Sequence, residues 1–157
     1  PVCSSAASDV YKRQMFIQEG KKVLIEDLMR GMIIQSGNDA ACALAEHIAG
    51  TQEDFASLMN DYAQKMELKN TNFTNPTGLP NVNHYSTAED IAKLSIVLIN
   101  DFPDEYSIYS EKEFTYNDIR QLNRNSLLWQ DDSIDGIKTG HTRASGYCWS
   151  PHLKEQT

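Results

Sequence analysis

The fold of this chain is decided by residues 134–149, which read IDGIKTGHTRASGYCW. Residues 134–141 have the pattern of a strand, residues 142–146 that of a turn, and residues 147–149 begin a returning strand. This stretch predicts a β-hairpin. Because one hairpin does not form an independently stable sheet, we expect the other strands of the sheet to lie outside this chain.

The sequence before this hairpin is mainly helical in pattern. Apolar residues recur at helical spacing, and two capping boxes, Thr51 with Asp54 and Ser86 with Glu89, mark the starts of two helices. Residues 70–85 between these two helices are rich in Asn, Pro and Gly and predict a loop. Five helices are predicted. The first runs from residue 25 to the break at 35–38, and the second covers 39–49 and ends at Gly50. The third begins at Thr51, the fourth runs from Ser86 to about 100, and the fifth covers about 119–129. The expected buried faces are Phe55, Leu58, Met59, Tyr62 and Met66 in the third helix and Ile91, Leu94, Val97 and Leu98 in the fourth.

A helical lobe followed by an antiparallel hairpin indicates the α+β class, and three segments are expected. Residues 1–14 carry no helical or strand period and are interpreted as a foreign or disordered extension. Residues 15–148 are expected to form part of one domain. Residues 149–157 are a divergent tail, in which Pro151 is expected to interrupt the returning strand.

Composition excludes several classes of function. The chain has 157 residues and a net charge of -8, which argues against nucleic acid as a partner because phosphate binding requires a basic face. Its three cysteines form no C-x-x-C pair, and its four histidines have no metal-ligand spacing, so no metal is predicted. No apolar run reaches the roughly 18 residues of a membrane span.

Two short motifs are candidates for chemistry. Ser36, Gly37 and Asn38 separate the first two predicted helices, and Lys138, Thr139 and Gly140 lie on the predicted strand. Taken singly, the first is explained by a loop with a helix N-cap, and the second by an ordinary strand end.

Together, in this order and after a helical lobe, the motifs resemble those of serine β-lactamases and penicillin-binding proteins, whose set is S-x-x-K, S-x-N and K-T-G. Over residues 15–148 the chain resembles low-molecular-mass penicillin-binding proteins, the serine-type D-alanyl-D-alanine carboxypeptidases. The resemblance is carried by LMRG at 28–31, QSGNDA at 35–40, ND at 100–101, EYSIY at 105–109, RQLNRN at 120–125 and DGIKTGHT at 135–142.

The resemblance implies a serine β-lactamase/transpeptidase-like fold, of which this chain covers the helical lobe and the first hairpin of the antiparallel sheet. Ser36 would then relay a proton to the departing amine, and Asn38 would hold the substrate's peptide group. Lys138 and Thr139 would bind the terminal carboxylate, although strand alternation puts their side chains on opposite faces and leaves the direction of Thr139 open.

The resemblance also implies how the substrate lies. It would run antiparallel to the strand beside Gly140, and the backbone N–H of His141, rather than its imidazole, would form half of an oxyanion hole. The implied substrate is peptidoglycan pentapeptide ending in D-Ala-D-Ala, β-lactams are the implied inhibitors, and the resemblance implies no cofactor. The implied location is the periplasm or the outer face of the inner membrane, with membrane attachment of the protein left open.

The nucleophile motif is missing from the chain, since no serine is followed three residues later by lysine. We therefore expect the chain to be the central segment of a longer protein, called the parent protein below, and to be inactive alone. By resemblance, S-x-x-K would precede Met15 in the parent protein.

Three alternatives remain. A serine β-lactamase would need a glutamate for deacylation, but Glu67 is followed four residues later by Thr71 instead of asparagine, and Ser-Gly-Asn stands where class A enzymes have Ser-Asp-Asn. An endopeptidase that cleaves cross-linked D-Ala bonds would use the same site. A non-catalytic module binding peptidoglycan or protein would use the two motifs only as a cap and a turn.

Overall fold

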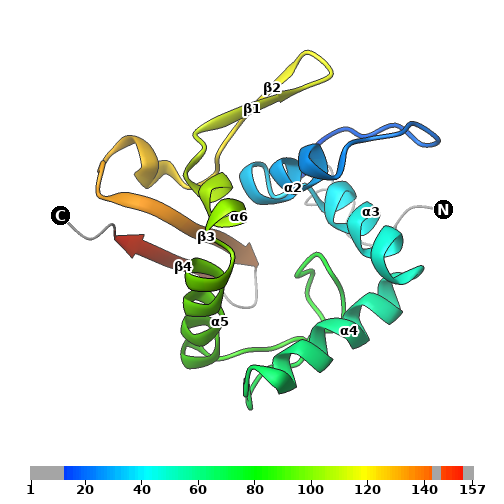
Figure 1. The fold of residues 1–157 in the computed structure, drawn as a ribbon, viewed down its shortest axis with the longest axis vertical. Coiled ribbons are helices and arrows are strands. Elements are labelled where there is room, and N and C mark those ends of the chain that lie inside the picture. The colour runs from blue at the N-terminus through cyan, green and yellow to red at the C-terminus, as the bar shows by residue number, and fades with distance from the viewer. Residues whose placement is uncertain (1–12, 143–145, 154–157) are drawn as a thin grey trace.

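The computed structural model describes residues 13–142 and 146–153, and Figure 1 shows their arrangement. Three helices follow one another along one side of the molecule, and the C-terminal hairpin lies on the other side with α5 and α6. The helical lobe and the hairpin are both present, which confirms the α+β class. The elements are α2 (Ile25–Ile34), α3 (Asn38–Ala49), α4 (Gln52–Lys65), α5 (Ala88–Asp101), α6 (Pro103–Ser107), the 3-10 turns η1 (Ile108–Ser110) and η2 (Ser126–Trp129), and strands β1 (Glu113–Tyr116), β2 (Ile119–Leu122), β3 (Ile134–Thr142) and β4 (Gly146–Leu153).

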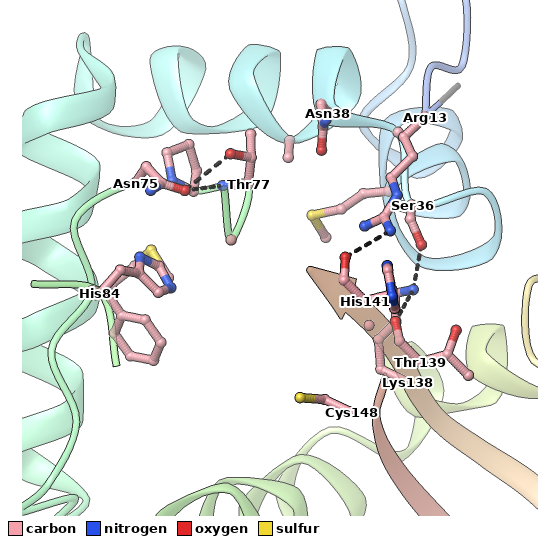
Figure 2. Close-up of a pocket in the computed structure, with 18 residues that line it drawn as sticks. Arg13, Ser36, Asn38, Asn75, Thr77, His84, Lys138, Thr139, His141 and Cys148 are labelled. Carbon is pink, nitrogen blue, oxygen red and sulfur yellow. Dashed lines mark hydrogen bonds between the residues drawn. The ribbon is translucent and has the colours of Figure 1, made fainter. Parts of the chain in front are cut away.

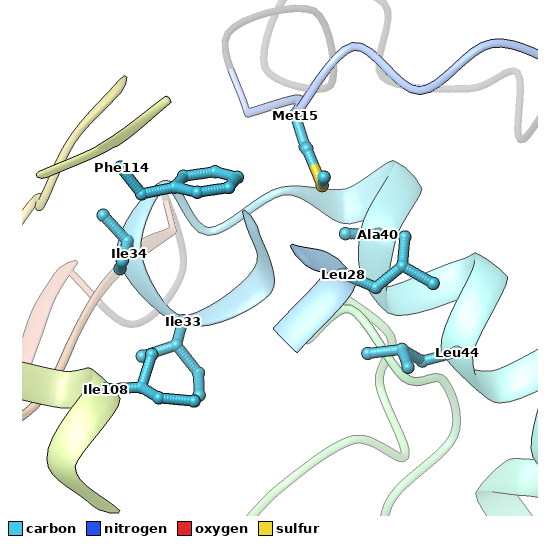
Figure 3. Close-up of a cluster of buried hydrophobic side chains, with 8 residues drawn as sticks. All are labelled: Met15, Leu28, Ile33, Ile34, Ala40, Leu44, Ile108 and Phe114. Carbon is cyan, nitrogen blue, oxygen red and sulfur yellow. The ribbon is translucent and has the colours of Figure 1, made fainter. Parts of the chain in front are cut away.

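The hydrophobic core joins α2 and α3 to the segments that follow α6. Gly31 on α2 has to lack a side chain, because a Cβ there would lie 2.2 Å from the sulfur of Met15. Close packing at this point lets the incoming chain pass directly over α2. The buried side chains of this core, drawn in Figure 3, are Met15, Leu28, Ile33, Ile34, Ala40, Leu44, Ile108 and Phe114.

Asp39, in the first turn of α3, ties the incoming chain to the helix. Its carboxylate accepts hydrogen bonds from the backbone N–H groups of Met15 (2.9 Å), Phe16 (2.9 Å) and Ile17 (3.2 Å), and from that of Ala40 (3.0 Å). A carboxylate is also favoured at a helix N-terminus by the helix dipole. The bonds hold the start of the domain against the turn that carries Ser36 and Asn38.

The substitution Asp39→Ala is expected to destabilise the parent protein by about 3 kcal/mol, since it removes several charge-assisted hydrogen bonds and leaves their N–H donors unpaired. Urea unfolding of the parent protein measures the change. Asp39→Asn is the matched control, because it keeps one acceptor oxygen and should cost less. An unchanged unfolding midpoint for Asp39→Ala would contradict this account.

The helix caps were predicted correctly for α4 and one residue too early for α5. Thr51 caps α4 as expected, with its hydroxyl oxygen accepting from the Asp54 N–H at 3.0 Å. For α5 the cap is Thr87, which accepts from the Asp90 N–H at 3.2 Å, so the Ser86–Glu89 box was wrong. The reason lies in Asp90, whose buried carboxylate accepts bonds from the 70–71 segment of the preceding loop and sets the helix start.

The predicted buried faces need correction. Tyr62 on α4 is 54% exposed, and the residues of that helix that are fully buried are Ala56 and Ala63. On α5 the expected apolar positions are only partly buried, and Asp90 is the fully buried residue. The apolar pattern found the helices but misjudged how deeply each face is covered by the described residues.

The helix predicted over residues 119–129 is wrong. This region begins with β2, which pairs antiparallel with β1 through Glu113 opposite Leu122 and Tyr116 opposite Ile119. The turn between the strands is Asn117-Asp118, and both residues have positive φ (47° and 61°). Two successive left-handed residues suit a two-residue hairpin turn, and Asn and Asp tolerate that conformation. Only residues 126–129 are helical, as the 3-10 turn η2.

The C-terminal hairpin is confirmed and extends further than expected. β3 and β4 pair antiparallel, with Gly140 opposite Cys148 and Lys138 opposite Ser150. Residues 143–145 of the predicted turn lie outside the described residues. Pro151 does not interrupt the strand, since β4 continues to Leu153 with Pro151 opposite Ile137. Within the described residues β4 pairs only with β3, and an edge strand accommodates proline.

None of the described helices is both long and apolar enough to cross a membrane.

Candidate active site

A pocket of about 410 Å³ lies between the start of α3, the 73–84 loop and β3 (Figure 2). It collects residues from distant parts of the sequence, including both motifs singled out above. Its lining is Arg13, Met32, Ser36, Gly37, Asn38, Ala41, Met59, Phe73, Asn75, Pro76, Thr77, Gly78, His84, Lys138, Thr139, Gly140, His141 and Cys148.

Ser36 lies in a tight turn that joins α2 to α3. Its φ of 60° places it in the left-handed region, which is uncommon for a residue other than glycine. The turn is closed by the Gly37 N–H, which donates to the Gly31 carbonyl at 3.0 Å. A Cβ at position 37 would lie 3.1 Å from that same oxygen, so glycine suits this position. The turn thus holds the Ser36 hydroxyl at the edge of the pocket.

Lys138 connects the two motifs. Its ammonium donates a hydrogen bond to the Ser36 hydroxyl and a second one, of 3.2 Å, to the Thr139 carbonyl. Burial lowers the pKa of Lys138, and the positive charges of Arg124 and Arg13 lower it further, to about 8. The structure therefore places a buried cation with a depressed pKa against a serine hydroxyl, although the two residues are 102 positions apart.

Asn38 is the first residue of α3 and is 8% exposed. Its backbone N–H donates to the Arg13 carbonyl at 2.9 Å, but its side-chain Nδ2 has no hydrogen-bond partner among the described residues. Buried amide donors are nearly always paired, and an unpaired one costs roughly 1–3 kcal/mol. Asn38 therefore lines the pocket with an amide whose buried donor is left unpaired by the described residues.

The edge of β3 that faces the pocket is defined by two carbonyls. That of Thr139 accepts from Lys138, and that of His141 accepts from the Arg13 guanidinium at 3.0 Å. Alternate residues of a strand direct their backbone groups to the same edge. The backbone groups of Lys138 and Gly140 therefore point to the opposite edge, along which β4 pairs. The backbone of Thr139 and His141 thus lies along the pocket.

The side chains of β3 alternate as the strand period requires. Figure 2 shows the Thr139 hydroxyl on the far side of the strand from the open centre of the pocket, away from the Lys138 ammonium. A Cβ at Gly140 would meet nothing closer than the Cys148 carbonyl at 3.9 Å. Packing of the described residues does not demand glycine there, so its small size leaves room beside the strand edge.

All six residues predicted for the site line the pocket. Sequence reasoning missed other residues that lie in or near it. Arg13 falls in the stretch we excluded, yet its guanidinium reaches β3. Arg124 is not among the lining residues, but its charge lowers the pKa of Lys138, and its Nε donates to the Gln35 carbonyl after α2 at 2.7 Å. His84 and Asn75 come from the loop that the sequence identified only by its turn chemistry, and no motif marked them as functional.

Comparison with known proteins decides the family. Residues 3–156 match the peptidase S11 family, described as D-alanyl-D-alanine carboxypeptidase. The chain belongs to this family. The resemblance drawn from the sequence is thereby confirmed. The D-alanyl-D-alanine carboxypeptidase DacA of Haemophilus influenzae is 53% identical over 135 residues, which are 85% of this chain and 34% of that protein. DacF of Bacillus subtilis is 36% identical and matches 97% of this chain and 40% of its own length.

Solved structures of the family share the fold. Penicillin-binding protein 5 from Haemophilus influenzae superposes with a TM-score of 0.82 at 52% identity, covering 85% of this chain and 39% of that one. The carboxypeptidase DacD from Francisella tularensis gives 0.86 at 33% identity, covering 91% and 47%. The chain thus spans less than half the length of each of these relatives. The serine β-lactamase/transpeptidase-like fold is confirmed for the part present here.

Proposed function

We propose that the parent protein is a serine-type D-Ala-D-Ala carboxypeptidase, which removes the terminal D-alanine from peptidoglycan pentapeptide through an acyl-enzyme. The observation that carries the proposal is the contact between Lys138 and Ser36 in a pocket of a chain of this family. Acyl transfer needs a nucleophile, a proton path to the leaving amine and stabilisation of the oxyanion. This chain offers groups for the proton path and for stabilisation of the oxyanion. The nucleophile, in an S-x-x-K motif, is expected from the rest of the parent protein.

Ser36 is suited to the proton path. When the amide bond breaks, the leaving amine of D-alanine must gain a proton, and the Ser36 hydroxyl can pass one on while Lys138 donates to its oxygen. Asn38 supplies an amide donor that has no partner among the described residues, and this donor is suited to the carbonyl of the substrate's peptide group. Lys138 supplies the positive charge for the terminal carboxylate.

The β3 edge is suited to hold the peptide as an added strand. The backbone groups of Thr139 and His141 lie along the pocket, and Gly140 between them adds no bulk. In this arrangement the His141 N–H would donate to the oxyanion, and its imidazole would take no part in proton transfer. Thr139 would reach the carboxylate only around the strand edge, because its hydroxyl leaves the opposite face from Lys138.

Inhibition by β-lactams and an extracytoplasmic location belong to the same proposal. Penicillin-binding protein D2 from Listeria monocytogenes, solved in an ampicillin-bound form, matches 91% of this chain at 29% identity with a TM-score of 0.80, over 60% of its own chain. A β-lactam would acylate the same nucleophile as the peptide. Since peptidoglycan lies outside the cytoplasmic membrane, we place the parent protein in the periplasm or at the outer face of the inner membrane.

An endopeptidase is the second candidate, because the D-alanyl-D-alanine endopeptidase of Escherichia coli is 31% identical over 88% of this chain. Relatives named carboxypeptidases reach 53%, which favours that activity.

The test is to incubate the purified parent protein with a pentapeptide ending in D-Ala-D-Ala, with a cross-linked dimer and with fluorescent penicillin. We expect D-alanine release from the pentapeptide, slower cleavage of the dimer and a stable covalent penicillin adduct. Preferential dimer cleavage would favour the endopeptidase, and rapid turnover of penicillin would favour a β-lactamase. If neither a penicillin adduct nor D-alanine release is seen, the proposal is contradicted, and the non-catalytic binding module becomes the remaining hypothesis.

A further inference from the structure

The pocket has a second wall, opposite β3, whose function no motif indicates. It is formed by the loop of residues 73–84, and Figure 2 shows Asn75, Thr77 and His84 on this side and Lys138 with His141 on the other. A molecule bound along β3 therefore has this loop as its other neighbour. Its hydrogen-bonding capacity decides what part of a substrate it can recognise.

The side-chain donors of two pocket-lining residues, Asn75 and Thr77, are consumed within the loop. Asn75 donates through Nδ2 to the Leu79 carbonyl (3.0 Å) and the Thr74 hydroxyl (3.3 Å), which uses both of its hydrogens. Its Oδ1 accepts from the backbone N–H groups of Thr77 and Leu79 (both 3.1 Å) and from the Thr77 hydroxyl (3.0 Å), which uses the one hydrogen of that hydroxyl. Asn75 therefore braces the loop, and neither residue keeps a donor for a ligand.

His84 is different. The backbone N–H of Thr74 donates to its Nδ1 at 3.2 Å, so that nitrogen must carry a lone pair. Burial lowers the pKa of His84, which keeps the ring neutral at pH 7. A neutral ring with a lone pair on Nδ1 carries its hydrogen on Nε2, and no described residue accepts a bond from Nε2. Phe73 fixes the ring by an edge-to-face contact with centroids 5.8 Å apart.

We propose that His84 is a substrate-binding residue, whose Nε2–H donates to a backbone carbonyl oxygen of the peptide that lies between the 73–84 loop and β3. The inference rests on the proposed function and adds a contact on the side of the peptide turned away from β3. The acceptor is a carbonyl because the neutral N–H of His84 suits a neutral oxygen, whereas the terminal carboxylate is drawn to the Lys138 ammonium on the other wall.

Two substitutions separate this role from a merely structural one. In His84→Asn the amide oxygen can replace the Nδ1 acceptor for Thr74, but the donor at the Nε2 position is lost. In His84→Gln the amide nitrogen can replace the Nε2 donor, but the Nδ1 acceptor is lost. We expect His84→Asn in the parent protein to raise KM for the D-Ala-D-Ala peptide roughly five- to tenfold with kcat within twofold, and His84→Gln to stay near the unchanged protein.

The opposite ranking, with His84→Gln impaired and His84→Asn normal, would show that His84 only braces Thr74 and would overturn the inference. Unchanged KM in both variants, or an equal rise in both, would also overturn it. Nitrogen-15 NMR of the ring is a second measurement, since a hydrogen on Nδ1 instead of Nε2 is incompatible with the proposed bond. If the unchanged parent protein releases no D-alanine, the proposed function fails and this inference fails with it.

Discussion

Ser36→Ala in the parent protein should lower kcat for D-alanine release by roughly 10²–10⁴-fold while the protein still folds. The hydroxyl accepts a bond from Lys138 at the pocket edge, and alanine removes the group that we propose accepts a proton and passes it to the leaving amine. Steady-state kinetics with the D-Ala-D-Ala peptide measures the loss, and thermal unfolding checks the fold.

Backbone strain is the competing explanation, because Ser36 has a φ of 60°. Ser36→Gly is the matched control, since glycine adopts this conformation without cost and also lacks the hydroxyl. Equal losses in Ser36→Ala and Ser36→Gly would assign the effect to the hydroxyl. Recovery in the glycine variant would assign it to strain, and normal turnover in the alanine variant would end the relay role.

Local patterns in the sequence predicted the elements that depend on local forces. Leu28 and Ile33 mark the face of α2 that enters the core, and the Thr51 hydroxyl caps α4, because periodicity and capping act within a few residues. The same reasoning failed over residues 119–129. The left-handed turn at Asn117 and Asp118 folds residues 119–122 back as strand β2, and only residues 126–129 are helical.

The site was harder to predict than the fold. Ser36 and Lys138 meet across 102 positions of sequence, and nothing in the local pattern of either motif shows that contact. The resemblance to a family assigned both motifs to one site but did not predict their contact. His84 lay beyond both approaches, because its candidate role emerges only when the side-chain donors of Asn75, Thr77 and His84 are each checked for an acceptor. Such accounting needs the folded structure.

Lys138→Met in the parent protein should lower kcat/KM for the D-Ala-D-Ala peptide by about 10- to 100-fold, as expected when a charge-assisted bond to a carboxylate is lost. Methionine keeps much of the length and the apolar stem of lysine, so the loss reports the ammonium. The matched substrate is the same peptide with its C-terminal carboxylate amidated, for which the loss should be smaller. An equal loss for both peptides would mean that Lys138 acts only through Ser36.

The pH dependence of the unchanged protein tests the same charge. Burial, Arg124 and Arg13 lower the pKa of Lys138 to about 8, so its ammonium is charged below that pH and neutral above it. Capture of the carboxylate should therefore weaken as pH rises through about 8, and kcat/KM, which reports groups of the free enzyme, should fall there instead of near the 10.5 of an ordinary lysine. Arg124→Gln removes one repelling charge and should move this fall to higher pH. A fall at the same pH in both proteins would mean that another group controls it.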